Sequence, residues 1–403
     1  MAGPKGRGRP AQGDDALPAS STILLTCPRG LSPFLAAEAA ALGYEGRELA
    51  AGVAVTGGPL DCLRLNLHLR TAHRVLYEVA RFRAPDPDAL YARGRELPWE
   101  EWFLPGAAFS ISSSVQNPHV RDTRFPNLRL KDAVADRFRA RTGSRPDSGR
   151  ERAGASVFLH WRGDDATVYL DTTGEPLARR GYRLQPHRAP MQETLAAACL
   201  LAADYDGALP LVNPMCGSGT LAIEAALIAT RTAPGLLRTN FAFSFLAPFA
   251  DEAGDKAWKD MRTQARRAMR PAPCPILATD IDPAAVDATR ANAERAGMDE
   301  AVAAVECDFR DTPLPSDPGI IVMNPEYGQR LGSQEKLEGI YAATGDWLKQ
   351  RCMGWRAFVF TGNLELAGRI GLRPSRRIPF WNAKIECRLL AYELYAGSRK
   401  SGA

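Results

Sequence analysis

The sequence lacks the features that mark membrane, secreted and zinc-binding proteins. None of its apolar runs reaches the roughly 18 residues that a membrane-spanning helix needs. Its eight cysteines include no Cys-x-x-Cys pair, which argues against a zinc site and suits a reducing compartment. Residues 1–20 contain few apolar residues and no hydrophobic stretch of the kind found in signal peptides. We therefore expect a cytoplasmic protein without a metal or a membrane segment, whose first 20 residues form a disordered tail.

Positive charge is concentrated in the first half of the chain. Residues 1–190 contain 27 lysines and arginines against 21 acidic residues, whereas the remainder contains 24 against 25. Residues 121–152 alone hold ten basic residues against five acidic ones. Such a cluster attracts phosphate backbones, although a solvated helix face with internal ion pairs is the alternative. The candidate nucleic-acid contacts are Arg121, Arg124, Arg129, Lys131 and Arg137.

A glycine-rich loop follows a short apolar run in the second half. The run is Leu211-Val212, and residues 221–229 repeat apolar residues at helical spacing, which predicts a strand, a tight turn and a helix. Glycines in the turn can adopt backbone angles closed to other residues, and the helix start offers unpaired N–H groups. The loop therefore suits a nucleotide, although an ordinary turn before a core helix is the alternative. The candidate cofactor contacts here are Asn213, Cys216, Gly217, Ser218, Gly219 and Thr220.

The loop also fits a dinucleotide fingerprint, so a nicotinamide enzyme is a competing interpretation. That fingerprint expects an acid roughly 20 residues further on, whereas Asp280 comes 61 positions after Gly219. Asp280 ends a predicted strand over 276–280, where its carboxylate can accept both ribose hydroxyls of an adenosine-containing cofactor, with Ile281 beside it. Asp282, before Pro283, is more typical of the cap of the next helix.

A further acid lies at the end of the next predicted strand, over residues 303–309. Asp308 can accept the amino group of an adenine, and Phe309 can flank the ring. Alternatively, Asp308 merely caps a turn. The order of strands and acids thus favours an adenosine-containing cofactor other than a standard dinucleotide.

The tetrapeptide Asn324-Pro325-Glu326-Tyr327 follows a predicted buried strand over 319–323. A nucleobase amine is a poor nucleophile because its lone pair is delocalised into the ring. The side-chain carbonyl of Asn324 and the backbone carbonyl of Pro325 can accept the amine hydrogens and turn the lone pair towards a methyl group, while Tyr327 stacks on the base. Positioning of this kind is worth up to roughly 7–11 kcal/mol. An Asn-Pro turn closing a strand is the alternative, but together with the glycine loop the tetrapeptide predicts methyl transfer from S-adenosylmethionine (SAM).

These motifs resemble those of the THUMP-domain class I RNA methyltransferases that make N2-methylguanosine. Within that family the chain is most similar to the L type that acts on large-subunit (23S) ribosomal RNA, in a short form with a single catalytic domain. The resemblance covers residues 22–396. Its strongest parts are residues 27–31, 179–183 with 189–190, 213–220 and 324–332.

The resemblance implies an α/β architecture in which a Rossmann-like, seven-stranded class I methyltransferase domain follows a ferredoxin-like and THUMP region that binds RNA. The expected divisions are a tail over 1–20, the RNA-binding region over 21–182, a linker over 183–190 and the methyltransferase domain over 191–397. A strand over 107–115, a helix over 130–142 and a hairpin over 156–171 are compatible with it. The resemblance also implies that Thr194, in the first helix of the catalytic domain, lies against the cofactor.

Two residues depart from the family pattern. Asn213 stands where the family usually has Asp, and Glu326 stands where it usually has a second Pro. The acceptor carbonyl of Pro325 survives, so an active enzyme is still expected, and the role of Glu326 is open.

Residues 231–275 form an insertion between the first two predicted catalytic strands. It contains the aromatic run 241–245 and a predicted basic helix over 257–269. A lid that stacks on or steers RNA and an aromatic core plug with a solvated helix are equally compatible with this pattern.

The sequence thus predicts a cytoplasmic, SAM-dependent RNA guanine-N2 methyltransferase with 23S ribosomal RNA as its first expected partner. A tRNA guanine-N2 methyltransferase would share every catalytic motif. A DNA adenine-N6 methyltransferase would use the same tetrapeptide but is not expected to carry an RNA-binding module. A catalytically inactive RNA-binding protein is the alternative from outside enzymology.

Overall fold

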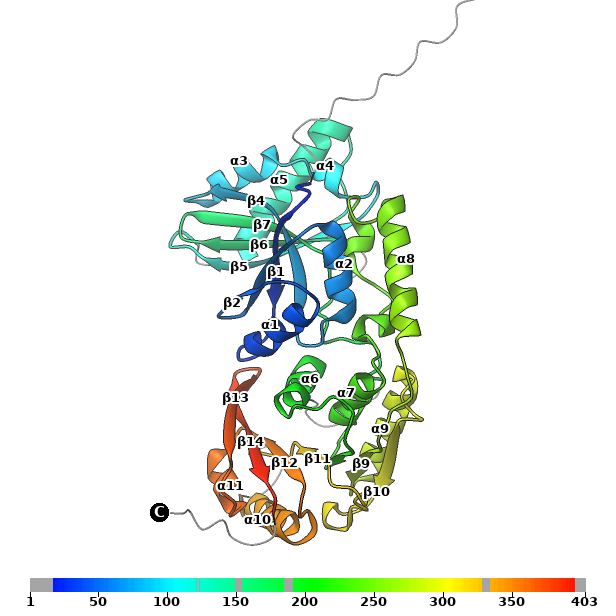
Figure 1. Ribbon diagram of the computed structural model, residues 1–403. Coiled ribbons are helices and arrows are strands. Elements are labelled where there is room, and N and C mark those ends of the chain that lie inside the picture. Colours follow the sequence, from blue (N-terminus) through cyan, green and yellow to red (C-terminus); the bar gives the residue numbers. More distant parts are fainter. Residues whose placement is uncertain are drawn as a thin grey trace, which may run out of the picture.

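The computed structural model describes residues 17–120, 122, 124–148, 154–184, 191–327 and 334–395. These residues form two seven-stranded sheets, one in each half of an elongated molecule (Figure 1). The expected disordered tail falls mostly, and the expected linker over 183–190 largely, outside the described residues. Within the described ranges, no helix is long and apolar enough to cross a membrane.

The N-terminal sheet is continuous across two α/β units. Its strands are β1 (Ser21–Thr26), β2 (Arg47–Leu49), β3 (Gly52–Gly57), β4 (Arg74–Arg83), β5 (Phe109–Gln116), β6 (Ala155–Arg162) and β7 (Asp165–Asp171), in the order β2-β3-β1-β4-β7-β6-β5. The helices are α1 (Ser32–Ala41), α2 (Pro59–His68), α3 (Pro87–Glu96), α4 (Trp99–Trp102) and α5 (Arg124–Thr142). All neighbouring strands are antiparallel except β5 and β6. Since β4 pairs with β1 on one side and β7 on the other, it joins the two units.

The C-terminal sheet is mostly parallel. Its strands are β8 (Leu211–Pro214), β9 (Ile276–Asp280), β10 (Val302–Glu306), β11 (Ile320–Met323), β12 (Arg356–Thr361), β13 (Arg376–Asn382) and β14 (Ile385–Glu393), in the order β10-β9-β8-β11-β12-β14-β13. Only β14 runs against its neighbours β12 and β13. The helices are α6 (Glu193–Ala202), α7 (Thr220–Ala229), α8 (Glu252–Arg267), α9 (Pro283–Ala296), α10 (Gln334–Arg351) and α11 (Leu364–Arg369), with short 3₁₀ turns η1 (Pro234–Leu237), η2 (Ala242–Phe245) and η3 (Phe309–Asp311).

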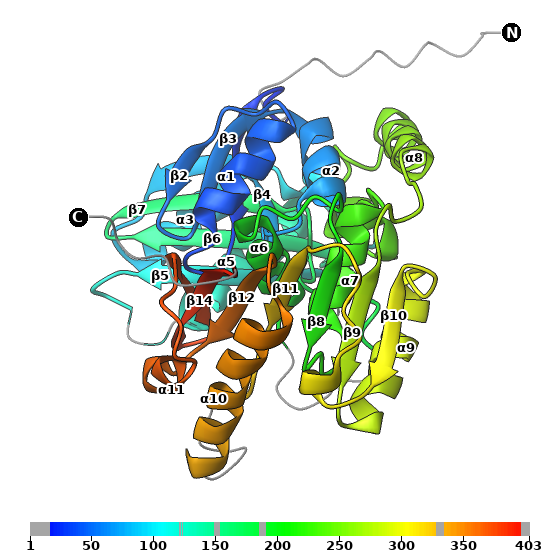
Figure 2. The same cartoon turned by 60° about the horizontal axis from the view of Figure 1, so that its bottom comes forward.

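Both faces of the C-terminal sheet are covered, which explains why β11 is apolar throughout. Ile320 and Val322 belong to one buried cluster, whereas Ile321 and Met323 belong to another. Alternate residues of a strand point to opposite faces, so each face has its own core. Figure 2 shows α10 in front of the strands. This arrangement, with an antiparallel strand near one edge, confirms the fold class expected from the resemblance.

Most predicted elements are found, and the deviations have local causes. The helix expected from residue 130 begins at Arg124, because Pro126 fits the first turn of a helix. The helix expected over 257–269 begins at Glu252, where the Asp251 side chain accepts a hydrogen bond from Gly254 N. Strand β13 was not predicted. It contains Pro379, which a strand tolerates at the edge of a sheet, and β13 is an edge strand.

The insertion over 231–275 is an aromatic plug that reaches back to the N-terminal half. Phe241 and Phe243 are buried and stacked at 5.0 Å, and Trp258 of α8 packs edge-on against both rings. Phe243 N donates to Thr172 O at 3.0 Å, and α8 packs against α2. Because the phenyl rings are buried, they are not free to stack on a base. Of the two interpretations that the sequence left open, the structure supports the core plug for these aromatics.

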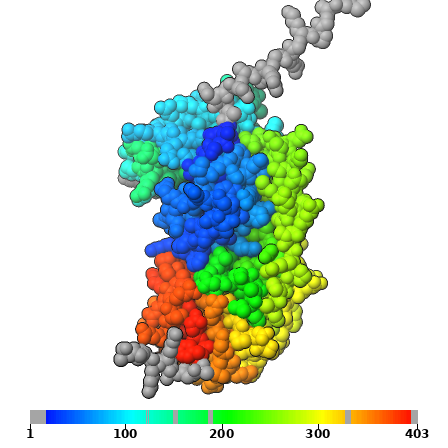
Figure 3. Space-filling view, in the orientation of Figure 1, coloured from blue at the N-terminus to red at the C-terminus, as the bar shows by residue number. Residues whose placement is uncertain are grey.

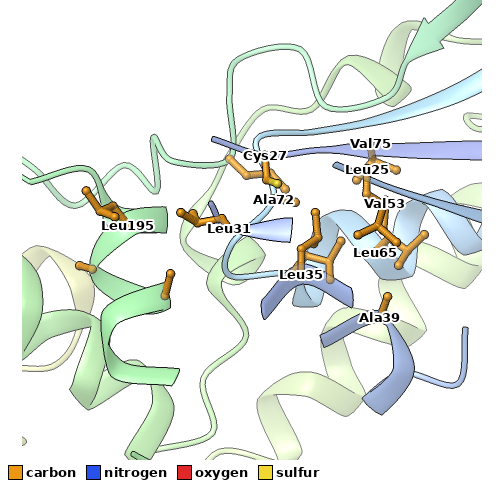
Figure 4. Close-up of a cluster of buried hydrophobic side chains, with 14 of the residues drawn as sticks. Leu25, Cys27, Leu31, Leu35, Ala39, Val53, Leu65, Ala72, Val75 and Leu195 are labelled. Atoms are coloured by element: carbon orange, nitrogen blue, oxygen red, sulfur yellow. The ribbon is translucent and has the colours of Figure 1, made fainter. Parts of the chain in front are cut away.

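One hydrophobic cluster runs through both halves. Figure 4 shows Leu31 and Leu35 of the N-terminal half in the same cluster as Leu195 of α6. A buried ion pair lies in the same region, since the Arg180 and Glu224 side chains are 1% and 0% exposed and 3.4 Å apart. Arg180 also donates to the backbone carbonyl of Arg70. The buried ion pair and the shared apolar cluster thus lie at the same seam between the halves.

Candidate cofactor and target-base site

The glycine loop lies between β8 and α7 and has open space beside it at Gly217. Gly219 has φ +79°, and a Cβ there would lie 2.6 Å from Thr289 Cγ2, so only glycine fits. At Gly217, by contrast, a Cβ would meet nothing within 4 Å. Cys216 N donates to Thr279 O at 3.0 Å, which ties the loop to β9. Thr220 is the first residue of α7, so the helix start opens directly onto the loop.

The thiol of Cys216 is not a nucleophile in this structure. Burial raises its pKa to about 12, so it stays protonated at neutral pH. Its Sγ lies 3.5 Å from Thr289 Oγ1. The candidate role of Cys216 is therefore packing beside a ligand.

Asp280 is the last residue of β9, and its side chain is hydrogen-bonded to the glycine loop. Its Oδ2 accepts a hydrogen bond from Gly217 N at 2.9 Å, and its Oδ1 accepts one from Asp282 N at 3.0 Å. Each carboxylate oxygen can accept a further bond, so both remain able to meet ribose hydroxyls. Asp282 caps α9 by accepting from Ala284 N, which confirms its predicted structural role. Ile281 is 68% exposed and offers an apolar surface beside the carboxylate.

Asp308 follows β10 and is held by Arg310. Its carboxylate accepts from Arg310 N at 2.9 Å and from the guanidinium at 2.7 Å and 2.8 Å. These hydrogen bonds hold the pKa of Asp308 below its ordinary value, so it stays ionised. Asp308 also caps η3, which agrees with the alternative interpretation that this residue caps a turn. Phe309 packs edge-on against Trp347 at 6.0 Å.

Three buried polar atoms near the ends of β8 and β11 and at the start of α6 have no hydrogen-bond partner within the described part of the chain. They are Thr194 Oγ1, Asn213 Oδ1 and Asn324 Oδ1. Asn213 Nδ2 donates to Val322 O at 2.8 Å, whereas no described residue donates to Asn213 Oδ1. A buried unpaired polar atom costs roughly 1–3 kcal/mol. Ligands that bind at the carboxyl ends of parallel strands would pair these atoms.

The tetrapeptide begins directly after β11. Pro325 is buried and Glu326 is exposed, so the carboxylate that departs from the family pattern lies in solvent. Tyr327 is partly buried, and its hydroxyl oxygen accepts a hydrogen bond from Asn382 Nδ2 at 2.9 Å. Burial raises the pKa of Tyr327 to about 12, which keeps the phenol neutral.

The first residues of the expected linker contact the glycine loop, a contact that the sequence analysis did not predict. Arg183 Nε donates to Glu193 Oε1 at 3.1 Å, and its Nη1 donates to Ser218 Oγ at 3.2 Å. Leu184 N donates to Asn292 Oδ1 at 2.8 Å, and Asn292 Nδ2 donates to Ser218 O at 3.0 Å. Arg183 lies in the motif over 179–183 that carried part of the family resemblance. That motif was the sequence signal from which a role for Arg183 could have been inferred.

Two of the candidate nucleic-acid contacts on α5 are engaged within the protein. Arg137 forms an ion pair with Glu100 at 2.7 Å and is only 17% exposed. Arg129 pairs with Asp88 at 2.7 Å and lies over the Tyr91 ring. Both ion pairs join α5 to another helix, whereas the alternative interpretation expected pairs within α5, of which Arg139 with Asp136 at 3.5 Å is an example.

The other basic candidates differ in their surroundings. Arg124 pairs with Asp122 at 2.8 Å and is 87% exposed. Lys131 forms no ion pair with the described residues. Arg121 lies outside the described residues. Within the described ranges, no group of three or more metal-ligating side chains comes together.

Comparisons with known proteins agree over nearly the whole chain. The RMKL-like methyltransferase domain model matches residues 180–391, the RlmL ferredoxin-like domain matches 22–76, and the THUMP domain matches 84–171. The ribosomal RNA large subunit methyltransferase K/L of Syntrophotalea carbinolica is 40% identical over 92% of this chain and 53% of its own length. A putative RNA methyltransferase of Synechocystis is 36% identical over 92% of this chain and 96% of its own.

A solved methyltransferase structure is similar to this chain over nearly its whole length. The crystal structure of a putative methyltransferase complexed with SAH is 25% identical, with a TM-score of 0.84 over 95% of this chain and 100% of that chain. The chain spans about half the length of the K/L relatives that it matches.

Proposed function

This chain belongs to the RMKL-like methyltransferase family, and from that premise we propose that it methylates the exocyclic N2 of a guanosine in RNA with SAM as methyl donor. We propose 23S ribosomal RNA as the substrate, since relatives named as large-subunit methyltransferases are 35–40% identical. The observation that carries the proposal is the buried Asn324 Oδ1, which has no hydrogen-bond partner among the described residues and lies at the end of β11, next to the strand that leads into the glycine loop. A substrate of this kind would place the protein in the cytoplasm.

The residues around the loop fit SAM. The open space at Gly217 leaves room for the ligand against the backbone, and the unpaired atoms of Thr194 and Asn213 can contact its amino-acid part. Asp280 can accept the ribose hydroxyls, and Asp308 the adenine amine. SAM supplies a methyl group on a positively charged sulfur, which needs little further activation.

The target amine would be oriented by acceptors rather than by a base. Asn324 Oδ1 and the Pro325 carbonyl can accept its two hydrogens and turn the nitrogen lone pair towards the methyl group. Tyr327, a neutral phenol, can stack on the base. The guanine must leave a helix to reach this point, and stacking offsets part of that cost of a few kcal/mol.

In this function residues 21–182 would bind RNA, residues 191–397 would transfer the methyl group, and residues 183–190 would link the two. On α5, Arg124 and Lys131 are the proposed phosphate contacts, because Arg124 is 87% exposed and Lys131 forms no ion pair with the described residues. Arg129 and Arg137 would contribute mainly by fixing α5 against α3 and α4. Arg121 is kept as a proposed contact.

Nucleoside mass mapping of RNA from a deletion strain tests the proposal. We expect one N2-methylguanosine to disappear from 23S ribosomal RNA and to return with the wild-type gene but not with Asn324→Ala. Loss from a tRNA instead would move the substrate to tRNA and keep the chemistry. Unchanged N2-methylguanosine in both RNA classes would refute the proposed function.

A further inference from the structure

The motif over residues 27–31 has no role in the proposed chemistry, yet it contacts the catalytic half. It forms the loop between β1 and α1 and lies against β13, at the seam that Figures 1 and 3 show between the blue and orange parts of the chain. The Arg29 guanidinium lies 4.2 Å from the centroid of the Trp381 ring. Gly30 has φ +88°, and a Cβ there would lie 2.9 Å from two atoms of that ring. The close approach of the loop to Trp381 therefore requires glycine.

The residue after Trp381 contacts the target-base site. Asn382, the last residue of β13, donates from Nδ2 to the Tyr327 hydroxyl oxygen at 2.9 Å. Because β13 carries Trp381 and Asn382 in succession, one strand end connects the N-terminal loop with the tetrapeptide. The Tyr327 hydroxyl also interacts with the Cys387 thiol of β14, so Asn382 is one of two polar neighbours of this side chain among the described residues.

The Tyr327 ring is confined by packing as well as by this hydrogen bond. A Cβ at Gly362 would lie 2.9 Å from two ring atoms of Tyr327 and 3.0 Å from Ile385 Cγ2. Phe360 meets the ring edge-on at 6.2 Å. The ring thus lies between the end of β12 and the turn after β13, and its hydroxyl forms the hydrogen bond with Asn382.

We propose that Asn382 is a positioning residue that fixes the Tyr327 ring for the target base, and that Arg29 and Gly30 hold β13 in place through Trp381. The inference rests on the proposed function, because it assumes that Tyr327 stacks on the methylated base. It gives the N-terminal loop a part in the reaction without contact with either the cofactor or the base. The contact also makes the geometry of the target-base site dependent on the junction of the two halves.

A double-mutant cycle tests the Asn382 contact. Asn382→Ala and Tyr327→Phe are each expected to slow single-turnover methylation of deletion-strain RNA by about two- to tenfold, the range for one hydrogen bond. The double variant should be no slower than Tyr327→Phe, because loss of the hydroxyl already removes the bond that Asn382→Ala removes. Asn382→Asp should restore the rate, since the tyrosine hydroxyl can donate to the carboxylate, and should not restore it in Tyr327→Phe. Calorimetric SAM affinity should stay at the wild-type value, and the melting temperature should fall by no more than about 4 °C, in line with the loss of one hydrogen bond.

The outcomes separate the inference from the proposed function. Inactive wild-type protein on deletion-strain RNA would overturn both. Active wild-type protein with multiplicative losses in the double variant, or with no rescue by Asn382→Asp, would overturn the role of Asn382 alone. A loss of SAM affinity in Asn382→Ala would also overturn it, because the effect would then reach the whole catalytic domain.

Arg29→Ala tests the link to the N-terminal loop, with Arg64→Ala as the matched control. Arg64 is also exposed and lies over an aromatic ring, Tyr44 at 5.7 Å, but does not touch β13. We expect Arg29→Ala to lower kcat about two- to fivefold, in line with one exposed cation–π contact, with SAM affinity unchanged. Arg64→Ala should keep the wild-type kcat. Equal kcat values in the two variants would refute the link through Trp381.

Discussion

Replacing Asp280 by alanine removes two features of the cofactor site at once. The carboxylate accepts a backbone hydrogen bond from Gly217, which shapes the glycine loop, and it presents acceptors to the ribose hydroxyls. The alanine variant should therefore bind SAM more weakly. Asp280→Asn keeps one oxygen that can accept from Gly217 but removes the negative charge, so its loss should be smaller.

The size of the effect follows from the bonds involved. A hydrogen bond to a charged group contributes about 1.5–3 kcal/mol, and tenfold in Kd corresponds to about 1.4 kcal/mol. Loss of one such bond to the ribose predicts a Kd about ten- to a hundredfold higher in Asp280→Ala. For Asp280→Asn, where a neutral acceptor remains, the expected rise is about three- to tenfold.

Isothermal titration calorimetry of the full chain with SAM measures this directly, and Asp282→Ala is the control. Asp282 lies two residues further on, caps α9 through Ala284 N and points to no ligand in the proposal. Its removal should cost about 1 kcal/mol of stability, the typical value of an N-cap, and leave Kd unchanged. Wild-type Kd in Asp280→Ala, or the same weakening in both variants, would contradict the assignment of the ribose site.

Other substitutions test the remaining parts of the site. Asn324→Ala should reduce the single-turnover rate about a hundredfold with SAM affinity intact, because one preorganised acceptor is lost, and a wild-type rate would refute the mechanism. Glu326→Pro should retain activity, because Glu326 is exposed and the carbonyl before it is kept; inactivity would give the carboxylate a role. Lys131→Gln should reduce the slope of log affinity for RNA against log salt by about 0.7–0.9, and an unaltered slope would remove Lys131 from the interface. Arg180→Met should lower the free energy of unfolding by about 3–5 kcal/mol, since it leaves the Glu224 carboxylate buried without its partner; denaturant unfolding within 1 kcal/mol of wild type would contradict this.

The parts of the fold that depend on local pattern could be predicted from the sequence. The apolar run before Asn324 and the helical spacing after Gly219 each determine an element whatever its neighbours are. Strand β13 could not be found in this way, because Pro379 argues against a strand until its place at the edge of the sheet is known.

The candidate site was predictable to the extent that its residues follow strand ends in order. The placement of Asp280 next to Gly217 needs only the geometry of parallel strands. The pairing of Arg137 with Glu100, by contrast, is a tertiary contact across 37 residues, and a charge count cannot distinguish it from a free cation. The contact of Asn382 with Tyr327 likewise depends on which strand ends meet, which no local pattern records.

The hydrogen bonds between the insertion and the N-terminal half affect how such a protein can be recombined. Phe243 N donates to Thr172 O, and Ala247 N donates to Trp102 O. The two donors belong to the catalytic half and the two acceptors to the N-terminal half. A chimera cut at residues 183–190 would bring a foreign RNA-binding half to an aromatic segment shaped for the native one. Exchange of substrate specificity by swapping halves would therefore have to transfer residues 241–267 as well. The two halves and the aromatic segment that joins them therefore form one structural unit, and we expect the two halves to change together in evolution.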